Sequence, residues 1–486
     1  MKSWLWLVFI FVFSLAFAGP IDELFSQFSQ DSTAEEQKAL IAKYLPQIQS
    51  LEDHRRLQSL WSYIDKDAMQ EHYSRLASLN PDDPDYLYLN LRFADNSVQI
   101  QESKRLLAKY PEHYWLYRLF TVSRSEQIHE AEDTSVILAS ANDDIKLLQQ
   151  GLNKYPDDAY LLITLFELHN AQSKTAEARN YLSRITDQQA LVSIWGQLHD
   201  FAVANQDIDL IKSRLPIFVS GYISSGYIEP QDSLGVYHNQ YLKFLGDIQD
   251  SQALAQFLAE QPYIADSADF AGVLPTVYAK VGNMDKAFEA LDTHVQSGAL
   301  TIHDLTDDGY ASLQSDPRWQ DLIGEAEQQW AAGKEDRRAE ALKSRTTTPA
   351  PLWELEDAQG KLIKLSDLKG KVLILDFWAT WCGPCRMAMP ALDEWMKTSM
   401  PQGVEVFSVN VMEKDPQTAK DYFKEHPFRM TLLMGNPELQ KAYNVEAIPQ
   451  ITVIDTMGRI AFNQVGFSPD LEEKLSFWTE ALLKEQ

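Results

Sequence analysis

Lys371–Pro390 reads KVLILDFWATWCGPCRMAMP, and this stretch decides both the fold and the chemistry of the C-terminal part of the chain. The continuous apolar run Val372–Trp378 predicts a buried strand, and the residues after the second cysteine predict a helix. Cys382 and Cys385, which stand between them, are the only two cysteines of the chain. Two cysteines three positions apart at a strand-to-helix junction can form a reversible disulfide, so the spacing predicts a redox motif.

A helix that begins at this motif would direct its N-terminus toward Cys382. Helix N-termini carry partial positive charge and unpaired N–H groups, which stabilise a thiolate, so the pKa of the first thiol in such motifs is ~7 rather than ~8.5. A zinc site is one alternative, but it needs four ligands, and the sequence has neither a second cysteine pair nor a histidine pair at ligand spacing nearby. An inert structural disulfide is the other alternative, and the context Trp-Cys-Gly-Pro-Cys favours redox chemistry over it.

The segment LDFWATWCGPC, Leu375–Cys385, resembles the active-site strand and loop of the thioredoxin superfamily. The flanking sequence resembles the TlpA/ResA branch of thiol–disulfide oxidoreductases, and the resemblance covers residues 351–486. It implies an α/β thioredoxin-like fold for these residues. It also implies that the enzyme needs no cofactor besides its own redox-active disulfide, in which Cys382 is the attacking and Cys385 the resolving thiol.

Asp376 lies in the middle of the predicted strand, where a carboxylate is costly unless it has a partner or a function. It matches the buried aspartate of thioredoxin, and the resemblance implies that it accepts the proton of Cys385. Burial should raise the pKa of Asp376, which suits a general base near neutral pH. The alternative is an aspartate at a strand end that faces solvent, and the apolar Phe377 and Trp378 beyond it argue against that.

Ile448-Pro449 stands just before a predicted strand and resembles the cis-proline loop of the family. Cis peptide bonds occur almost only before proline. The resemblance implies that this loop lies against the cysteine pair and that its backbone pairs with an extended substrate segment. An ordinary trans proline in a turn is the alternative. The residues predicted to contact substrate are Trp381, Gly383, Pro384, Ile448 and Pro449.

Two positions depart from the family pattern. Many TlpA/ResA relatives carry a glutamate where this chain has Ala388, so the acid–base role would fall to Asp376 alone. The lysine that thioredoxin carries on the neighbouring strand is absent, and Ser408 stands near its place. The stretch between Val411 and Ile448 resembles the helix-containing insertion of the TlpA/ResA and peroxiredoxin-like branches. The peroxiredoxin pattern PxxxTxxC is missing, which argues against a peroxidase.

The pattern of residues 351–486 predicts a mixed sheet with helices on both faces. Two alternating segments around Gly360 predict a hairpin before the cysteine motif. The elements predicted after the motif are a strand at Val404–Val411, helices at Pro416–Glu425 and Pro437–Tyr443, a hairpin of Ile451–Asp455 with Arg459–Val465, and a helix at Pro469–Lys484.

Residues 19–345 predict helices almost throughout, because apolar residues recur at three- and four-residue spacing. Proline turns with acidic neighbours separate helical stretches at Pro81, Pro111 and Pro156, and Gly282 predicts a tight turn within a later helix pair. These features resemble degenerate tetratricopeptide-type hairpins, so we predict an all-α TPR-like solenoid. An irregular all-α domain is the alternative. A solenoid would offer a surface for docking protein clients.

Residues 1–18 predict a secretory signal peptide, because Lys2 precedes an apolar run and Ala16-Phe17-Ala18 is a cleavage pattern. The run is shorter than the ~20 residues of a spanning helix, and an uncleaved N-terminal membrane anchor is the alternative. We therefore expect an exported protein, soluble after cleavage, in the periplasm of a Gram-negative bacterium. The Thr- and Pro-containing residues 346–350 predict a linker between the helical domain, 19–345, and the thioredoxin-like domain, 351–486.

The composition narrows the range of partners. The chain has 43 Lys+Arg and 70 Asp+Glu, a net charge of −27, and its sequence contains no basic run. Nucleic acid and anionic membrane surfaces are therefore poor partners. The histidines show no metal-ligand pattern, so we expect no metal site.

The hypothesis that joins these observations is an exported thiol–disulfide oxidoreductase. Gly383-Pro384 between the cysteines matches reducing thioredoxins and favours a reductase. The resemblance implies protein disulfide or thiol clients and a membrane thiol electron donor. The alternatives are a protein-binding TPR-like scaffold with an accessory redox domain, and a disulfide oxidant or isomerase on the same fold.

Overall fold

The computed structural model describes residues 19–28, 33–131, 134–306, 308–413 and 415–485. The predicted signal peptide, residues 1–18, lies outside the described residues. Within the described residues, no helix has both the length and the apolar character needed to cross a membrane. The chain divides into two compact units, Met1–Phe244 and Leu245–Gln486, and each is described by itself.

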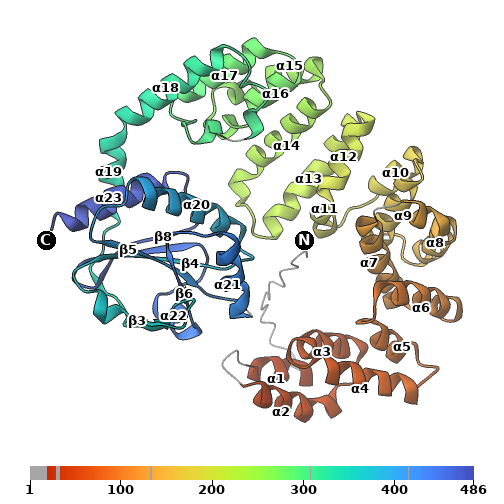
Figure 1. The fold of residues 1–486 in the computed structure, drawn as a ribbon. Coiled ribbons are helices and arrows are strands. Elements are labelled where there is room, and N and C mark those ends of the chain that lie inside the picture. Colours follow the sequence, from red (N-terminus) through yellow and green to blue (C-terminus); the bar gives the residue numbers. More distant parts are fainter. Residues whose placement is uncertain (1–18, 29–32, 132–133, 307, 414, 486) are drawn as a thin grey trace. The chain divides into compact units, whose positions relative to one another are not determined.

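The described part of the first unit is built from helices (Figure 1), which confirms the predicted all-helical region. They are α1 (Pro20–Gln27), α2 (Ala34–Tyr44), α3 (Leu51–Ile64), α4 (Lys66–Leu79), α5 (Pro84–Leu91), α6 (Asn96–Lys109), α7 (Tyr114–Glu130), α8 (Thr134–Lys154), α9 (Ala159–Ala171), α10 (Thr175–Leu182), α11 (Gln188–Ser193), α12 (Trp195–Asn205) and α13 (Ile208–Ser224), while α14 (Ser233–Asp247) crosses the division.

The three predicted proline turns each separate two helices, α4 from α5, α6 from α7 and α8 from α9. Successive turns repeat one contact. Tyr110 Oη donates to the backbone O of Asp82 in the preceding turn at 3.0 Å. Tyr155 Oη donates in the same way to the backbone O of Glu112 at 2.8 Å. The repeated contact holds neighbouring helical hairpins together, whereas the TPR-like character of the array stays a prediction.

The second unit begins with further helices, which are α15 (Ser251–Glu260), α16 (Leu274–Lys280), α17 (Met284–Gln296), α18 (Arg318–Ala332) and α19 (Lys334–Lys343). Gly282 makes the predicted tight turn between α16 and α17 with φ +78°, a conformation that favours glycine. Ala287 on α17 is fully buried in the core of this helical group. Its small side chain leaves room for neighbouring helices to approach closely.

The remaining residues of the second unit form the predicted α/β domain. Its strands and helices are β1 (Thr348–Pro349), β2 (Glu354–Glu356), β3 (Leu362–Lys364), β4 (Val372–Trp378), α20 (Gly383–Thr398), β5 (Val404–Asn410), α21 (Pro416–Glu425), β6 (Thr431–Met434), α22 (Pro437–Ala442), β7 (Gln450–Ile454), β8 (Arg459–Val465) and α23 (Leu471–Leu483). Six strands form a sheet in the order β1-β8-β7-β4-β5-β6, and β2 pairs with β3 as the predicted hairpin. Strand β6 was not predicted.

Both faces of this sheet are covered, as the element order predicted. On one face, side chains of β4 and β5 pack with α20 and α23, and Trp395 and Trp478 are the largest contributions from these helices. On the other face, β4 and β5 pack against the β2–β3 hairpin and α22 through residues such as Leu355 and Tyr443. Strand β4 therefore lies in the middle of a three-layered core, parallel to β5 and antiparallel to β7.

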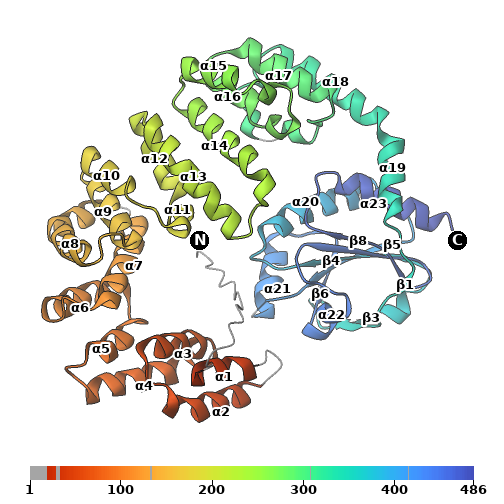
Figure 2. The same cartoon turned by 180° about the vertical axis from the view of Figure 1, so that it is seen from behind.

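Residues 346–350, which the sequence predicts to be a linker, contain a short strand of the sheet. Thr348 and Pro349 form β1, which pairs with β8 at the edge of the sheet (Figure 2), and the N–H of Thr346 donates to the backbone O of Ala461 at 2.8 Å. Proline is tolerated there because an edge strand leaves one side of its backbone unpaired. Residues that read as a stiff connector thus belong to the sheet. Whether the redox domain folds independently from residue 351 stays a prediction.

Helix α19, which precedes this strand, packs on α23 (Figures 1 and 2). Trp478 Nε1 donates to the backbone O of Ala341 at 3.0 Å, and Leu342 packs on the core beneath α23. Arg337 donates two hydrogen bonds to the carboxylate of Glu473, at 2.7 and 2.9 Å. Helix α19 therefore completes the cover of the redox domain and belongs with it structurally.

We predict that a fragment of residues 334–486 unfolds at a higher temperature than a fragment of residues 351–486. Removing α19 and β1 uncovers the apolar surface of α23 and leaves Trp478 Nε1 without its acceptor. A loss of each kcal/mol lowers Tm by roughly 2–8 °C for domains of this size, so the difference should be several degrees in a calorimetric scan.

The control is the longer fragment with Lys343→Gln, which loses the exposed ion pair with Glu340 but keeps the apolar contacts. Exposed ion pairs contribute about 0–1 kcal/mol, so this variant should stay close to the unchanged longer fragment. Equal melting temperatures for the 334–486 and 351–486 fragments would contradict the assignment of α19 to the redox domain.

Candidate active site

The cysteine pair lies at the carboxyl end of the central strand. Cys382 is the N-cap of α20, and the N–H of Cys385 donates to its Sγ at 3.2 Å. A disulfide joins the two cysteines. Cys382 is 5% exposed and Cys385 is 0% exposed. The structure therefore brings Cys382 to the helix N-terminus, as the sequence predicts, and makes it the more accessible of the two sulfurs.

The two cysteines are part of an apolar cluster. Both cysteines pack with Trp378 and Met389, and Trp378 in turn lies against Tyr422 of α21, with ring centroids 5.4 Å apart. Such surroundings favour a neutral thiol over a thiolate at Cys385. By contrast, Cys382 faces the unpaired N–H groups at the start of α20, which favour a thiolate. The two sulfurs thus have environments suited to different roles.

The Ile448–Pro449 peptide bond is cis, and it lies against the cysteine pair as the resemblance implied. The Sγ of Cys382 is 3.6 Å from the backbone O of Ile448. In the reduced protein, the S–H of Cys382 can donate to this oxygen. Pro449 is buried and Ile448 is partly exposed, so the backbone before the proline borders the surface beside Cys382.

Asp376 is completely buried in β4. Ser408 of β5 stands opposite it in the strand register, and the Ser408 hydroxyl donates to Oδ2 of Asp376 at 3.4 Å. Oδ1 has no hydrogen-bond partner. Burial raises the pKa of Asp376 to about 7, and the hydrogen bond from Ser408 opposes the rise only in part. Burial thus raises the pKa of Asp376, as the sequence predicted. The alternative of an aspartate that faces solvent is wrong.

The alternation of β4 places Asp376 on the face that α20 covers, because side chains two positions apart lie on the same face of a strand. Ile374, on one side of Asp376, packs in the cluster that contains Ala388 of α20. Trp378, on the other side, packs in the cluster that contains Cys385 of α20. Asp376 thus lies beneath the first turns of the helix that carries Cys385.

The surface beside Cys382 carries apolar side chains. Trp381 is 37% exposed and Met387, which sequence reasoning missed, is 55% exposed. Pro384 is also exposed, and a Cβ added at Gly383 would meet open space. The predicted contact residues Trp381 and Pro384 thus expose apolar surface close to Cys382 in the sequence, and Met387 adds to it from α20. The signal in the sequence was the position of Met387 in the first turn and a half of the predicted helix.

A loop after β5 holds the active-site loop through two contacts that the sequence did not suggest. The N–H of Thr380 donates to Oε1 of Glu413 at 2.5 Å, and Trp381 Nε1 donates to the backbone O of Met412 at 3.3 Å. Met412 has φ +61°, a left-handed conformation that non-glycine residues rarely adopt. Glu413 thus places a carboxylate against the residue two positions before Cys382, and no periodic pattern links positions so far apart in the chain.

The departures from the family pattern are visible in the structure. Ala388 is 1% exposed and adds no titratable group to the site. Ser408 lies on the neighbouring strand β5, as expected, and the register places it opposite Asp376. Among the described residues, no group of three or more His, Cys, Asp and Glu is placed to hold a metal ion. Two carboxyl groups lie near the cysteine motif, Asp376 on the strand face that α20 covers and Glu413 against Thr380.

The C-terminal part of the chain is similar to a known protein family. The model of the AhpC/TSA family matches residues 346–463. The chain is similar to the thiol-disulfide oxidoreductase ResA of Bacillus subtilis (strain 168), with 36% identity over 112 residues, which are 23% of this chain and 62% of the relative. It is also similar to ResA of Bacillus anthracis, with 30% identity over 129 residues, 26% of this chain and 74% of the relative.

Among solved structures, the chain is similar to a thiol:disulfide interchange protein of the thioredoxin family from Chlorobium tepidum TLS. The identity is 30%, the match covers 28% of this chain and 97% of that chain, and the TM-score is 0.26. The chain spans less than two thirds of the length of the first of the curated relatives, 62% of the B. subtilis protein.

The raised pKa of Asp376 predicts how Asp376→Asn changes stability with pH. In the unfolded chain this carboxyl has a pKa near 3.8, whereas in the fold it is about 7. Between these values the unfolded chain loses the proton that the folded chain keeps, so the wild type loses stability as pH rises. Asparagine stays neutral and avoids this loss. The stability advantage of Asp376→Asn should therefore grow between pH ~4 and ~8, by up to about 4 kcal/mol.

Urea unfolding at a series of pH values measures this difference. Asp367→Asn is the matched control, because Asp367 is exposed and the substitution removes the same charge. Its stability relative to the wild type should change little over the same range. A stability difference between Asp376→Asn and the wild type that stays constant with pH would show that the fold does not raise the pKa of Asp376.

Proposed function

Because the chain belongs, through its C-terminal domain, to the ResA family of thiol–disulfide oxidoreductases, we propose that it exchanges disulfides with protein clients through Cys382 and Cys385. The observation that carries this proposal is the asymmetry of the pair. Cys382 lies at a helix N-terminus beside the cis-proline loop, whereas Cys385 is fully buried on the face that holds Asp376. This asymmetry supports Cys382 as the sulfur that meets a client and Cys385 as the sulfur that resolves the complex.

The first step is the attack of the Cys382 thiolate on one sulfur of a client disulfide. The S–S bond of the client breaks, a mixed disulfide forms, and the client's other sulfur leaves as a thiolate. The N–H of Cys385 already donates to Cys382 Sγ, so the charged sulfur is stabilised before a client arrives. The backbone of Ile448 lies next to this sulfur and would pair with an extended client segment.

The second step resolves the mixed disulfide. Asp376 takes the proton of the Cys385 thiol, and the resulting thiolate attacks Cys382 Sγ. The mixed disulfide breaks, the client leaves with both of its sulfurs reduced, and the Cys382–Cys385 disulfide forms. A pKa of about 7 suits Asp376 to this role, because the carboxyl can be ionised before the step and can hold the proton after it.

The proposed direction is reduction of clients, with export of the chain to the periplasm. Gly383-Pro384 supports the direction, because the same pair occurs in reducing thioredoxins. Residues 1–18 support export through their signal-peptide pattern. Each turnover leaves the enzyme oxidised, so continued reduction needs a donor of thiol equivalents, and we propose a membrane thiol electron-transfer protein.

The helical region is proposed to dock clients in the manner of a TPR-like solenoid. The repeated turn contacts of Tyr110 and Tyr155 support an array of stacked hairpins, which presents an extended surface. The region contains no cysteine, so it takes no part in disulfide exchange itself. Docking would raise the concentration of a client beside Cys382.

The asymmetry of the cysteine pair predicts the outcome of trapping experiments. Cys385→Ser leaves the attacking sulfur but removes the resolving one, so mixed disulfides with clients should accumulate. Cys382→Ser leaves only the fully buried sulfur and should trap none. Non-reducing gels of cell extracts followed by mass spectrometry measure both. Equal trapping by the two variants would contradict the assignment of Cys382 as the attacking thiol and Cys385 as the resolving thiol.

If the helical region docks clients and the redox domain exchanges disulfides, removing the helices should affect insulin reduction and client trapping differently. A chain without residues 19–333 keeps α19 and the complete redox domain, so its reduction of insulin should stay within about threefold of the full chain, since the chemistry is untouched. In the Cys385→Ser background, the same deletion should sharply reduce the amount of trapped client.

The double variant Cys382→Ser, Cys385→Ser in the full chain is the control for the scaffold alternative. It should fail to replace the wild-type protein in a strain that lacks it. Full complementation by this variant would reject the enzyme function in favour of a scaffold, whereas undiminished trapping after the deletion would reject the docking role alone.

A further inference from the structure

The second unit contains an open pocket of about 580 Å³, within the ~300–1,000 Å³ range of ligand pockets. Two parts of this unit line it. One wall comes from the helical group α15–α18 and includes Leu300 and Tyr310 from the segment between α17 and α18. The other wall is formed by Phe467 and Pro469, in the loop between β8 and α23 of the redox domain.

The loop wall of this pocket is continuous with the cis-proline loop of the active site. The N–H of Gly466 donates to the backbone O of Pro449 at 2.8 Å. Phe467 is the next residue, and successive Cα atoms are only ~3.8 Å apart. The pocket therefore begins one residue beyond the point where the loop after β8 is bonded to Pro449.

Contacts within the second unit connect the two walls. His303, which lines the pocket, packs edge-on against Trp330 of α18, with ring centroids 4.7 Å apart. Arg337 of α19 stacks on the same indole, with its Cζ 3.5 Å from the ring centroid. The guanidinium of Arg337 also donates two hydrogen bonds to Glu473 of α23, the helix that follows the loop wall. The walls are thus tied to each other without a ligand.

The lining of the pocket favours an apolar occupant. Leu300 and Tyr310 are almost fully buried, Phe467 is partly buried on the core beneath α23, and Pro469 is exposed. Among the described residues that line the pocket there is no lysine or arginine, whereas Asp304 contributes a carboxylate. An acidic side chain would meet this carboxylate without a cation to pair with, so the pocket disfavours it.

A client bound at the cis-proline loop comes within reach of this pocket. The Sγ of Cys382 is 3.6 Å from the backbone O of Ile448, with which the client backbone is proposed to pair. From there the path to Phe467 runs through Pro449 and its hydrogen bond to Gly466. An extended chain advances ~3.3 Å per residue, so a client residue about three to five positions from its cysteine reaches the pocket.

We propose that this pocket binds a large apolar side chain, such as Phe or Leu, from the client segment that pairs with Ile448. The inference rests on the proposed disulfide exchange and specifies which client segments it favours. The redox domain supplies only the loop wall, so the selection depends on the helical group of the second unit.

The test uses the full chain, reduced beforehand, and Ser–Gly peptides whose single cysteine carries nitrothiobenzoate through a disulfide. The Cys382 thiolate attacks the peptide sulfur, the coloured thiolate leaves, and Cys385 then releases the peptide as a thiol. Phe or Ser is placed at each position in turn on either side of the cysteine. Phe about three to five positions away should raise the second-order rate constant about tenfold over Ser, because burial of an aromatic side chain contributes on that scale.

Gly272→Leu tests the wall from the helical group. Gly272 lines the pocket, and a Cβ added there meets open space, so a leucine side chain can occupy part of the pocket without displacing a neighbour. This variant should lose most of the preference for Phe. Gly324→Leu on α18 is the matched control, because Gly324 also has open space around an added Cβ but lies outside the pocket. It should keep the preference.

A second variant tests the loop wall and guards against misfolding of Gly272→Leu. Pro469 is exposed, so Pro469→Glu should fold normally and place a carboxylate beside the apolar occupant. It should slow the reaction of the Phe peptide more than that of the Ser peptide. Thermal unfolding checks that all three variants are folded.

Three outcomes overturn the proposal. They are equal rates for Phe and Ser at every position, a preference for Phe that survives both Gly272→Leu and Pro469→Glu, and an equal preference for Glu at the same position. Failure of the proposed disulfide exchange gives a different result, because the wild type would then release no more coloured thiol than Cys382→Ser from any peptide.

Discussion

The central strand β4 is buried along its whole length, and this constraint shapes the redox domain. Buried backbone groups must be paired, and β4 pairs with β5 on one side and with β7 on the other. Because β7 runs antiparallel to β4, the end of one strand lies beside the start of the other, and Gln450 stands opposite Phe377. The cysteine motif and Pro449 lie far apart in the sequence but meet at this edge of the sheet.

The same burial explains why Asp376 can serve as a base. A carboxylate on the surface would have a low pKa and little affinity for a proton near pH 7, whereas complete burial raises the pKa of Asp376 to about 7. The single hydrogen bond from Ser408 stabilises the charged form too weakly to cancel this effect. Because Ala388 stands where the family resemblance implies a glutamate, the proposed proton transfer relies on Asp376 alone and therefore on its placement by β4.

The sequence predicted most of the redox domain because its signals are local. The cysteine motif, the bounds of α21 and β8, and the buried Asp376 follow from runs and turns that lie within a few residues of one another. Strand β6 was missed because a run as short as Thr431–Met434 does not distinguish a strand from a helix. Thr348-Pro349 read as a linker because proline and threonine mark connectors, and only the pairing with β8 reveals an edge strand. The contact of Glu413 with Thr380 has no local signal.

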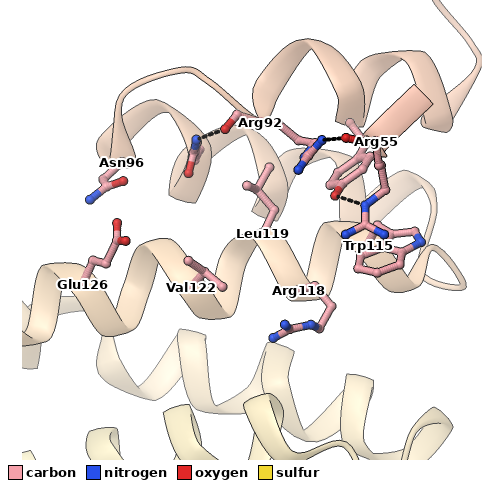
Figure 3. A pocket seen from close by; sticks show the side chains of 10 residues that line it. Arg55, Arg92, Asn96, Trp115, Arg118, Leu119, Val122 and Glu126 are labelled. Atoms are coloured by element: carbon pink, nitrogen blue, oxygen red, sulfur yellow. Dashed lines mark hydrogen bonds between the residues drawn. The ribbon is translucent and has the colours of Figure 1, made fainter. Parts of the chain in front are cut away.

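Helical periodicity predicts which residues lie on a common face of a helix but not what that face contacts. Arg55 and Arg118 stand on separate helices, and each alone reads as a solvated charge. In the fold, each guanidinium instead stacks on an aromatic ring of another helix, Arg55 on Trp115 (Figure 3) and Arg118 on Tyr160. Cation–π contacts of this kind help to hold neighbouring helices together. Because such a pair joins residues of two different helices, no amphipathic pattern within one helix contains it, so the sequence predicts the helices of this region but not their packing.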